Sequence, residues 1–156
     1  LFALLTYWRC PQGRAANLSG FEIDAYRVYM DFRSRFEHAQ AHLRNIARAR
    51  YLARAFERHP DAYDAIFMLF PFIFPKDHLE WGLPRPLFQP QVLLGDAWES
   101  LKAGGVLAIV NQGRAEYEAQ AELLAGIHVV PTWHGEHASL LYRYDLPRYT
   151  FVCVKQ

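Results

Sequence analysis

Residues 98–110 read Trp98-Glu99-Ser100-Leu101-Lys102-Ala103-Gly104-Gly105-Val106-Leu107-Ala108-Ile109-Val110, and they carry the strongest fold signal of the chain. Apolar side chains recur at helical spacing from Gln91 to Lys102, which predicts a helix. The glycine pair predicts a tight turn that ends this helix, because glycine adopts left-handed backbone conformations at little cost. The apolar run 106–110 is typical of a buried strand. Together they predict one helix-to-strand crossover of an α/β sheet.

Length and composition predict a single domain over residues 1–156. Of the 156 residues, 52% are hydrophobic and 15% aromatic, which suffices for one sizeable core. The formal net charge of +1 provides no overall field to attract nucleic acid or a membrane. No apolar run reaches the roughly 18 residues of a membrane span, and no charged leader opens the chain, so we expect a cytoplasmic protein.

Before residue 60, segments with strand-like spacing of apolar residues alternate with segments with helix-like spacing. Residues 1–9 have the pattern of a helix tail, and residues 18–24 alternate apolar with polar side chains before turning acidic, which predicts a strand. From Ala25 to Glu37 the apolar residues fall on one helical face. Residues 38–60 fit either a weak strand at 42–47 followed by a helix at 51–58, or one long helix.

The remaining segments continue this alternation. The apolar run Ala65–Phe70 predicts a central parallel strand, and the proline-rich segment 71–90 predicts a long loop after it. A helix is expected over 115–125, and strands over 128–130, 139–144 and 149–154, with the last two paired as a hairpin. The expected fold class is therefore α/β: a Rossmann-like, open and mostly parallel sheet with helices on both faces and a C-terminal antiparallel hairpin.

Two strand ends carry the candidate site, because ligands of open α/β sheets bind at the carboxyl ends of the strands. Glu22 and Asp24 end the first predicted strand, where a carboxylate can accept hydrogen bonds from a ribose diol. Either residue could instead cap a following helix, and we favour Glu22 for the ribose and Asp24 for the cap. Leu69, Phe70 and Pro71 end the later strand.

The proline-rich loop after Pro71 is also aromatic. Its large side chains Phe72, Phe74 and Trp81 could form an apolar wall for a substrate or could pack as a lid over the sheet edge. Asn111, after the strand that follows the glycine pair, could hydrogen-bond a substrate or cap the next helix. We therefore expect Phe72, Phe74, Trp81 and Asn111 to bind substrate.

The order of these parts resembles the class I S-adenosylmethionine-dependent methyltransferases. The acidic strand end, the strand from Tyr63, the Leu101-Lys102-Ala103-Gly104-Gly105 turn and the terminal hairpin carry the resemblance, over roughly residues 15–156. It implies S-adenosylmethionine as cofactor, with its ribose on Glu22. The residues after the fourth strand of that family border the methionine moiety and the acceptor, which places Leu69, Phe70 and Pro71 there.

The resemblance also has a gap at the start of the chain. The family's first strand and glycine-rich cofactor loop have no counterpart, since Leu1 would lie in the helix that follows them. We therefore interpret the chain as an N-terminally incomplete methyltransferase domain, active if the full-length protein supplies that loop. The predicted acceptor is a small molecule. No catalytic residue emerges, because methyl transfer depends on positioning more than on a dedicated acid or base.

Two alternatives remain open at this level. Without its glycine loop, the domain could be a non-catalytic binding or scaffolding module. A stripe of arginines spaced by four residues along a helix could contact RNA, although such a run is more often a solvated face; its members are Arg44, Arg48, Arg50, Arg54 and Arg58. His134-Gly135-Glu136-His137 is interpreted as a polar loop and not as a metal site, because Gly135 opposes a helix that would align the histidines.

Overall fold

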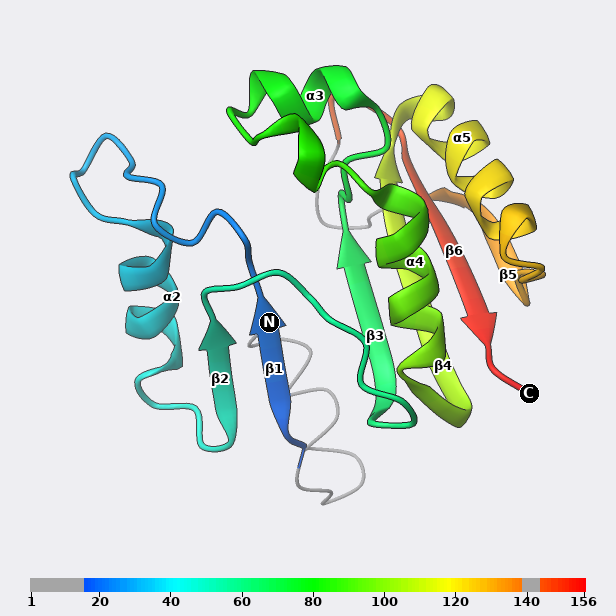
Figure 1. Ribbon diagram of the computed structural model, residues 1–156, viewed down its shortest axis with the longest axis horizontal. Coiled ribbons are helices and arrows are strands. Elements are labelled where there is room, and N and C mark those ends of the chain that lie inside the picture. The colour runs from blue at the N-terminus through cyan, green and yellow to red at the C-terminus, as the bar shows by residue number, and fades with distance from the viewer. Residues whose placement is uncertain (1–15, 139–143) are drawn as a thin grey trace. The chain divides into compact units, whose positions relative to one another are not determined.

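The computed structural model describes residues 16–138 and 144–156, and the chain divides into two compact units, Leu1–Phe56 and Glu57–Gln156. The first unit contains the strands β1 (Leu18–Phe21) and β2 (Ala49–Leu52) and the helix α2 (Arg35–Leu43) (Figure 1). The two strands pair in parallel, with Leu18 opposite Ala49 and Phe21 opposite Leu52. The expected first strand is thus confirmed at residues 18–21, and the expected helix tail at residues 1–9 lies outside the described residues.

The helix predicted from Ala25 is wrong, because α2 begins only at Arg35. Ser34 caps it: its side chain accepts a hydrogen bond from the Glu37 amide, and the Glu37 carboxylate accepts one from the Ser34 amide. This reciprocal capping box fixes the start of a helix more strongly than apolar spacing does. The preceding residues fold back on themselves instead, with the Tyr29 amide donating to the Arg33 carbonyl at 2.9 Å.

Residues 38–60 follow neither interpretation of the sequence. α2 ends at Leu43, and β2 occupies 49–52, so the weak strand at 42–47, the helix at 51–58 and the single long helix are all wrong. Arg48 has a φ of 64°, a left-handed conformation that interrupts a helix. The hydrogen bonds that β2 gains from β1 are tertiary, and they outweigh the helix propensity of alanine and arginine here.

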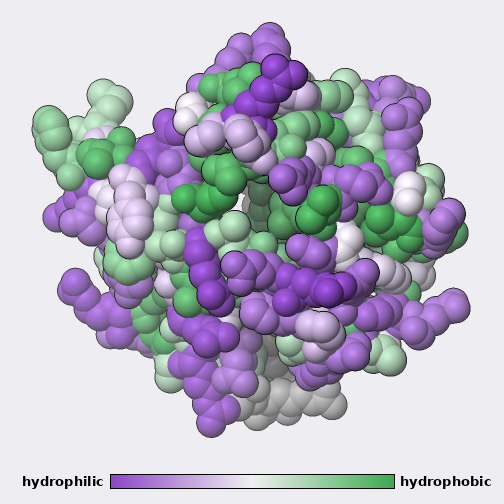
Figure 2. Space-filling model, viewed as in Figure 1, coloured by the Kyte–Doolittle hydropathy of each residue, from purple (hydrophilic) through white to green (hydrophobic). Residues whose placement is uncertain are grey.

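The segment between β1 and α2 displays a group of exposed apolar side chains. Met30 and Phe32 are 98% and 89% exposed, and Tyr26 and Val28 beside them are also exposed. Figure 2 shows hydrophobic residues gathered at this protruding segment. Tyr26, Val28 and Phe32 belong to the apolar positions whose spacing predicted a helical face, yet their side chains are exposed.

The second unit is built on a four-stranded mixed sheet with the order β3-β4-β6-β5. β3 (Tyr63–Leu69) runs parallel to β4 (Leu101–Gln112), whereas β6 (Arg148–Val154) is antiparallel to both β4 and β5 (Trp133–His137). The helices α4 (Pro90–Glu99) and α5 (Gly113–Gly126) pack on each other and against this sheet (Figure 1). The apolar strand predicted over 65–70 is confirmed as β3. Within this unit, however, its Phe67 and Leu69 side chains are exposed, so coverage of both faces is not observed.

The glycine pair does not form the turn that ends the helix. α4 stops at Glu99, and β4 already begins at Leu101, so Gly104 and Gly105 lie inside the strand. Tyr63 pairs with Leu101 while Ala65 pairs with Val106, and this register shift leaves residues 102–105 as a bulge. Gly104 has a φ of 75° there, a conformation that favours glycine. The crossover is therefore confirmed, and the role of its glycines is corrected.

The C-terminal hairpin is present with a different first strand. Residues 128–130 are not a strand, and β5 instead includes the His134-Gly135-Glu136-His137 stretch interpreted as a loop. Trp133 pairs with Val152 and His137 with Arg148, which joins β5 to β6. Most of the strand expected over 139–144 lies outside the described residues. The hydrogen bonds of β6 allow a polar stretch to serve as its edge partner.

The core of the second unit lies between the sheet and the helices α4 and α5. Leu107 and Ile109 of β4 face Cys153 and Phe151 of β6, and all four side chains are buried. Burial raises the pKa of the Cys153 thiol to about 11, so it is protonated and unreactive at neutral pH. Among the described residues, no helix has both the length and the apolar character that crossing a membrane requires.

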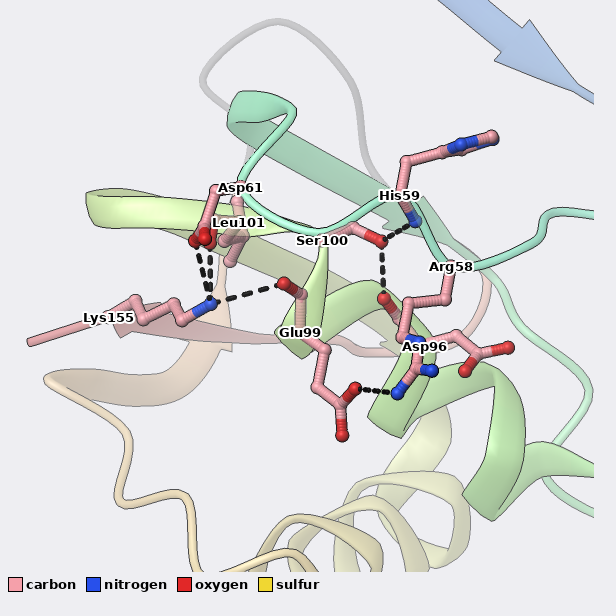
Figure 3. A network of polar contacts seen from close by, with 8 residues as sticks. All are labelled: Arg58, His59, Asp61, Asp96, Glu99, Ser100, Leu101 and Lys155. Carbon is pink, nitrogen blue, oxygen red and sulfur yellow. Dashed lines mark hydrogen bonds and ion pairs between the residues drawn. The ribbon is translucent and has the colours of Figure 1, made fainter.

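Opposite the carboxyl ends of the parallel strands, a polar network joins the end of α4 to the chain entering β3 (Figure 3). The Ser100 hydroxyl donates to the Asp96 carbonyl at 2.6 Å and accepts from the His59 amide at 2.8 Å. The Lys155 ammonium donates to the Leu101 carbonyl at 2.6 Å and to the Glu99 carbonyl at 3.2 Å. These bonds satisfy the Asp96 and Glu99 carbonyls at the C-terminal end of α4 and the Leu101 carbonyl at the start of β4, which indicates a structural role for this edge.

Candidate functional site

Glu22 follows β1 directly and lies at the carboxyl end of the parallel pair. Its Oε1 accepts a hydrogen bond from the Asp24 amide at 2.9 Å, and its Oε2 accepts one from Arg35 Nη1 at 2.7 Å. Asp24 forms an ion pair with Arg27. The expected capping role of Asp24 is wrong, because a turn and not a helix follows it directly, and Ser34 caps α2. The structure therefore holds the Glu22 carboxylate in a defined orientation.

Arg35 reaches Glu22 from the first turn of α2, and it is a residue that sequence reasoning missed. Its Nε donates to the Tyr29 hydroxyl at 3.0 Å. Burial by itself would lower the pKa of Arg35. The hydrogen bonds to Tyr29 and Glu22 favour the charged form and together outweigh this effect, so the pKa of Arg35 is raised. No local sequence signal could have revealed this, since Arg35 and Glu22 are 13 residues apart.

The side chain of Tyr51, in β2, is influenced by the charges of Glu22 and Arg35. Its hydroxyl oxygen is buried and has no hydrogen-bond partner among the described residues. Burial raises the pKa of Tyr51 to about 12, and the negative charge of Glu22 acts in the same direction. The hydroxyl is thus neutral at physiological pH and is available as a donor.

In the second unit, the residues at the end of β3 are exposed and one is strained. Leu69 is 63% exposed and Phe70 is 48% exposed. Phe70 has a φ of 54°, although its amide still donates to the Val110 carbonyl at 2.9 Å. A left-handed conformation costs a non-glycine residue of the order of 1 kcal/mol, and such residues concentrate at functional sites. Pro71 follows, so the three predicted residues do lie together at the carboxyl end of the strand.

The aromatic segment after Pro71 is a folded element and not the long loop that its prolines predicted. It contains the helix α3 (Pro75–Glu80) and the short 3₁₀ helix η1 (Arg85–Leu87). Prolines at the start of both elements occupy the position where a missing amide hydrogen costs nothing. Two of the prolines that suggested a loop therefore lie at the starts of helices.

His78 of α3 organises this segment, and sequence reasoning missed it. It is only 4% exposed, and its Nε2 donates to the Pro84 carbonyl at 2.9 Å. Its ring lies 5.7 Å from Phe72 and 5.4 Å from Phe88, and Phe72 also lies 6.1 Å from Trp81. The structure thus brings Phe72 and Trp81 into one aromatic cluster. Phe74 precedes α3 as its N-cap residue.

Asn111 lies near the carboxyl end of β4 and is fully buried. Neither atom of its side-chain amide has a hydrogen-bond partner among the described residues. The capping alternative is wrong, because the N-cap residue of α5 is Gln112. Leaving a buried polar group unpaired costs about 1–3 kcal/mol. Such a group in a native fold calls for a further partner, such as water or a ligand.

Glu116 and Arg148 add charge near this strand end. The Glu116 Oε2 accepts from the Gln112 amide at 2.6 Å. Arg148 begins β6, and its guanidinium carbon lies 4.9 Å from the Phe70 ring and 5.0 Å from the Tyr144 ring. These cation–π contacts link the predicted residue Phe70 to a cation that the sequence did not single out.

The Glu116 carboxyl predicts a pH-dependent contribution to stability. Its partial burial raises its pKa, against the opposing hydrogen bond from Gln112. The folded state therefore binds this proton more tightly than the unfolded chain does, so the contribution is present at low pH and is lost as the pH rises through the raised pKa. We expect Glu116→Gln to increase the free energy of unfolding at pH 7 more than at pH 3, measured by urea denaturation. An equal change at both values would contradict this.

The arginine stripe is not formed. Arg44 is the C-cap of α2, Arg48 is in a left-handed conformation and Arg50 is in β2, so no helix aligns the five side chains. Arg50 donates to the Ser19 hydroxyl at 2.8 Å, and Arg58 pairs with Glu99. The predicted helical RNA contact therefore loses its structural basis.

The two histidines of His134-Gly135-Glu136-His137 lie in β5 and pair with residues of β6. His134 Nδ1 lies 2.5 Å from the Tyr117 hydroxyl, and its ring stacks 5.9 Å from Phe151. Within residues 16–138 and 144–156, no cluster of histidine, cysteine or carboxylate side chains could hold a metal ion.

Comparison with known proteins identifies solved structures that share this fold. No protein-family model and no curated protein matches the sequence. Solved structures do match it: the N-methyltransferase NodS from Bradyrhizobium japonicum is 10% identical, with 98% of this chain and 93% of that chain covered and a TM-score of 0.59. A Leishmania major S-adenosylmethionine-dependent methyltransferase is 9% identical, with 99% and 70% covered and a TM-score of 0.57. The chain has the fold of these methyltransferases.

The methyltransferase fold also accommodates another chemistry. The [4+2]-cyclase SpnF is 11% identical to this chain, with 96% of this chain and 69% of that chain covered and a TM-score of 0.62. At such low identity the likeness concerns the fold alone, and function must be argued from the site.

Proposed function

We propose that this chain is an S-adenosylmethionine-dependent methyltransferase domain that acts on a small-molecule acceptor. The observation that carries the proposal is the Glu22 carboxylate at the carboxyl end of β1, in a fold shared with methyltransferases. Ligands of open α/β folds bind at such strand ends. The cofactor would supply the methyl group.

Glu22 suits the ribose of the cofactor. Within the described part of the chain, each of its carboxylate oxygens accepts one hydrogen bond, Oε1 from the Asp24 amide and Oε2 from Arg35. An ionised carboxylate has about four acceptor positions, so capacity remains for two ribose hydroxyls. Asp24 lies beside it and is committed to Arg27, which gives it a supporting role.

The acceptor and the methionine moiety are assigned to the second unit. Leu69, Phe70 and Pro71 would border the methionine moiety, because they are exposed or half-buried at the end of β3. Phe72, Phe74 and Trp81 would wall the acceptor, and Asn111 would supply a buried amide for a polar group of the substrate. Alignment of donor and acceptor would then provide most of the rate enhancement, without a catalytic acid or base.

Titration calorimetry with S-adenosylmethionine tests this assignment. We expect Glu22→Ala to weaken binding about 10- to 100-fold, because a hydrogen bond to a charged group is worth about 1.5–3 kcal/mol. Glu118→Gln is the matched control, since Glu118 is an exposed carboxylate on α5 that pairs with Arg114. Its affinity should equal that of the wild type.

A folded sample that gives no heat with S-adenosylmethionine would contradict the proposal and support the binding or scaffolding alternative. Binding without methyl transfer to a panel of small molecules would instead separate cofactor recognition from the reaction. That distinction matters because a cyclase shares the fold.

A further inference from the structure

We infer that Arg35 is a positioning residue for the cofactor: it orients the Glu22 carboxylate toward the ribose. The inference rests on the proposed function, in which Glu22 binds that ribose. Arg35 would act through Glu22 and would not itself touch the ligand.

The first step is the geometry of the pair. Arg35 Nη1 donates to Glu22 Oε2 at 2.7 Å, while the Asp24 amide donates to Glu22 Oε1 at 2.9 Å. The Asp24 contact is local, since it comes from the backbone two residues away. Among the described residues, the Arg35 contact is the one that ties the carboxylate to another element of the fold.

The second step is that Arg35 is itself held in place. Its amide donates to the Arg27 carbonyl at 2.9 Å, and the Phe36 amide donates to the Ala25 carbonyl at 2.7 Å, so the start of α2 is tied to the segment after β1. Its Nε donates to the Tyr29 hydroxyl at 3.0 Å. A side chain anchored at both backbone and head group fixes its partner at a lower cost in entropy than a mobile one.

The third step is the electrostatics of the pair. The side chains of Arg35 and Glu22 are only 19% and 28% exposed, so solvent screens their attraction less than that of a surface pair. A carboxylate that keeps its charge and its orientation is a stronger acceptor for ribose hydroxyls. Without Arg35, Glu22 would retain one local bond and could rotate away.

A double-mutant cycle tests this role on the full chain, with S-adenosylhomocysteine as the calorimetric probe. We expect Arg35→Ala to weaken binding about tenfold in the wild type and less than about twofold when Glu22 is already alanine. Arg35→Lys should recover part of the affinity, since it keeps the charge but loses the fork of donors. Tyr29→Phe, which removes only the anchor, should weaken binding by a smaller factor.

Arg50→Ala is the matched control, because Arg50 lies on β2 in the same unit and its side chain donates to the Ser19 hydroxyl and not to Glu22. Its affinity should be unchanged. If Arg35→Ala does not fold, the Arg35→Lys and Tyr29→Phe variants are measured in the same two backgrounds.

The outcomes separate the two claims. Equal losses with and without Glu22, or no loss on removing Arg35, overturn the positioning role while leaving the cofactor assignment intact. A folded wild-type chain that does not bind the probe overturns the cofactor assignment, and the role of Arg35 falls with it.

Discussion

Replacing Phe151 with alanine is expected to lower the free energy of unfolding by about 3–5 kcal/mol, the usual cost of removing a buried phenylalanine. Phe151 of β6 is fully buried in the second unit, and its ring packs on Tyr117 of α5. Its ring stacks 4.9 Å from Tyr117 and 5.9 Å from His134, so the substitution removes these contacts as well as apolar burial. Urea denaturation of the full chain, followed by near-ultraviolet circular dichroism, measures the change.

Val154→Ala is the control for Phe151, since Val154 is on the same strand but its side chain is 40% exposed. We expect it to cost less than about 1 kcal/mol, because only part of the lost apolar surface is buried. Similar losses for the two variants would show that Phe151 is not packed as described.

Replacing Gly105 with alanine is expected to cost about 1–3 kcal/mol, the usual range for overpacking a filled site. A Cβ at this position would lie 2.8 Å from the Lys102 carbonyl oxygen and 3.2–3.3 Å from the Leu101 side chain. The first neighbour is backbone inside the β4 bulge and cannot move aside as a flexible side chain would. The free energy of unfolding in urea again provides the measurement.

Gly95→Ala is the matched substitution for Gly105→Ala. Gly95 lies inside α4, and a Cβ there would meet no atom within 4 Å. Alanine should therefore stabilise the chain by about 0.5–1 kcal/mol through its higher helix propensity. Opposite signs at the two glycines are the expected result. A stabilised Gly105→Ala variant would refute the bulge geometry.

For the candidate site, local sequence was sufficient for residues at strand ends. An acidic residue after an alternating run placed Glu22 at the end of β1, and an apolar run followed by proline placed Leu69 and Phe70 at the end of β3. Their partners could not be found in this way. Arg35 meets Glu22 only because the chain folds back at residues 27–34, and Arg148 meets Phe70 only because β6 returns beside β4.

The aromatic segment shows the same division. Its composition indicated that the large side chains need a partner, and the structure supplies much of that partner from the segment itself, around His78. The sequence around His78 contains aromatic residues and prolines but no pattern that predicts burial of the histidine. The burial of His78 depends on the contact between α3 and η1. Pro75 and Pro86 lie in the first turns of these two helices and favour their formation.

Sequence patterns were enough to identify the apolar strands, the helices α4 and α5 and the mixed α/β class, because each depends on the period of side chains along one segment. Tertiary structure alone decided that the glycine pair forms a bulge inside β4 and not a turn, since the bulge exists only in register with β3. It also decided the edge strand β5 and the start of α2 beyond residue 34. In each case, hydrogen bonds between distant segments or a reciprocal cap outweighed local propensity, and residues 98–110 therefore predicted the crossover correctly but not its internal geometry.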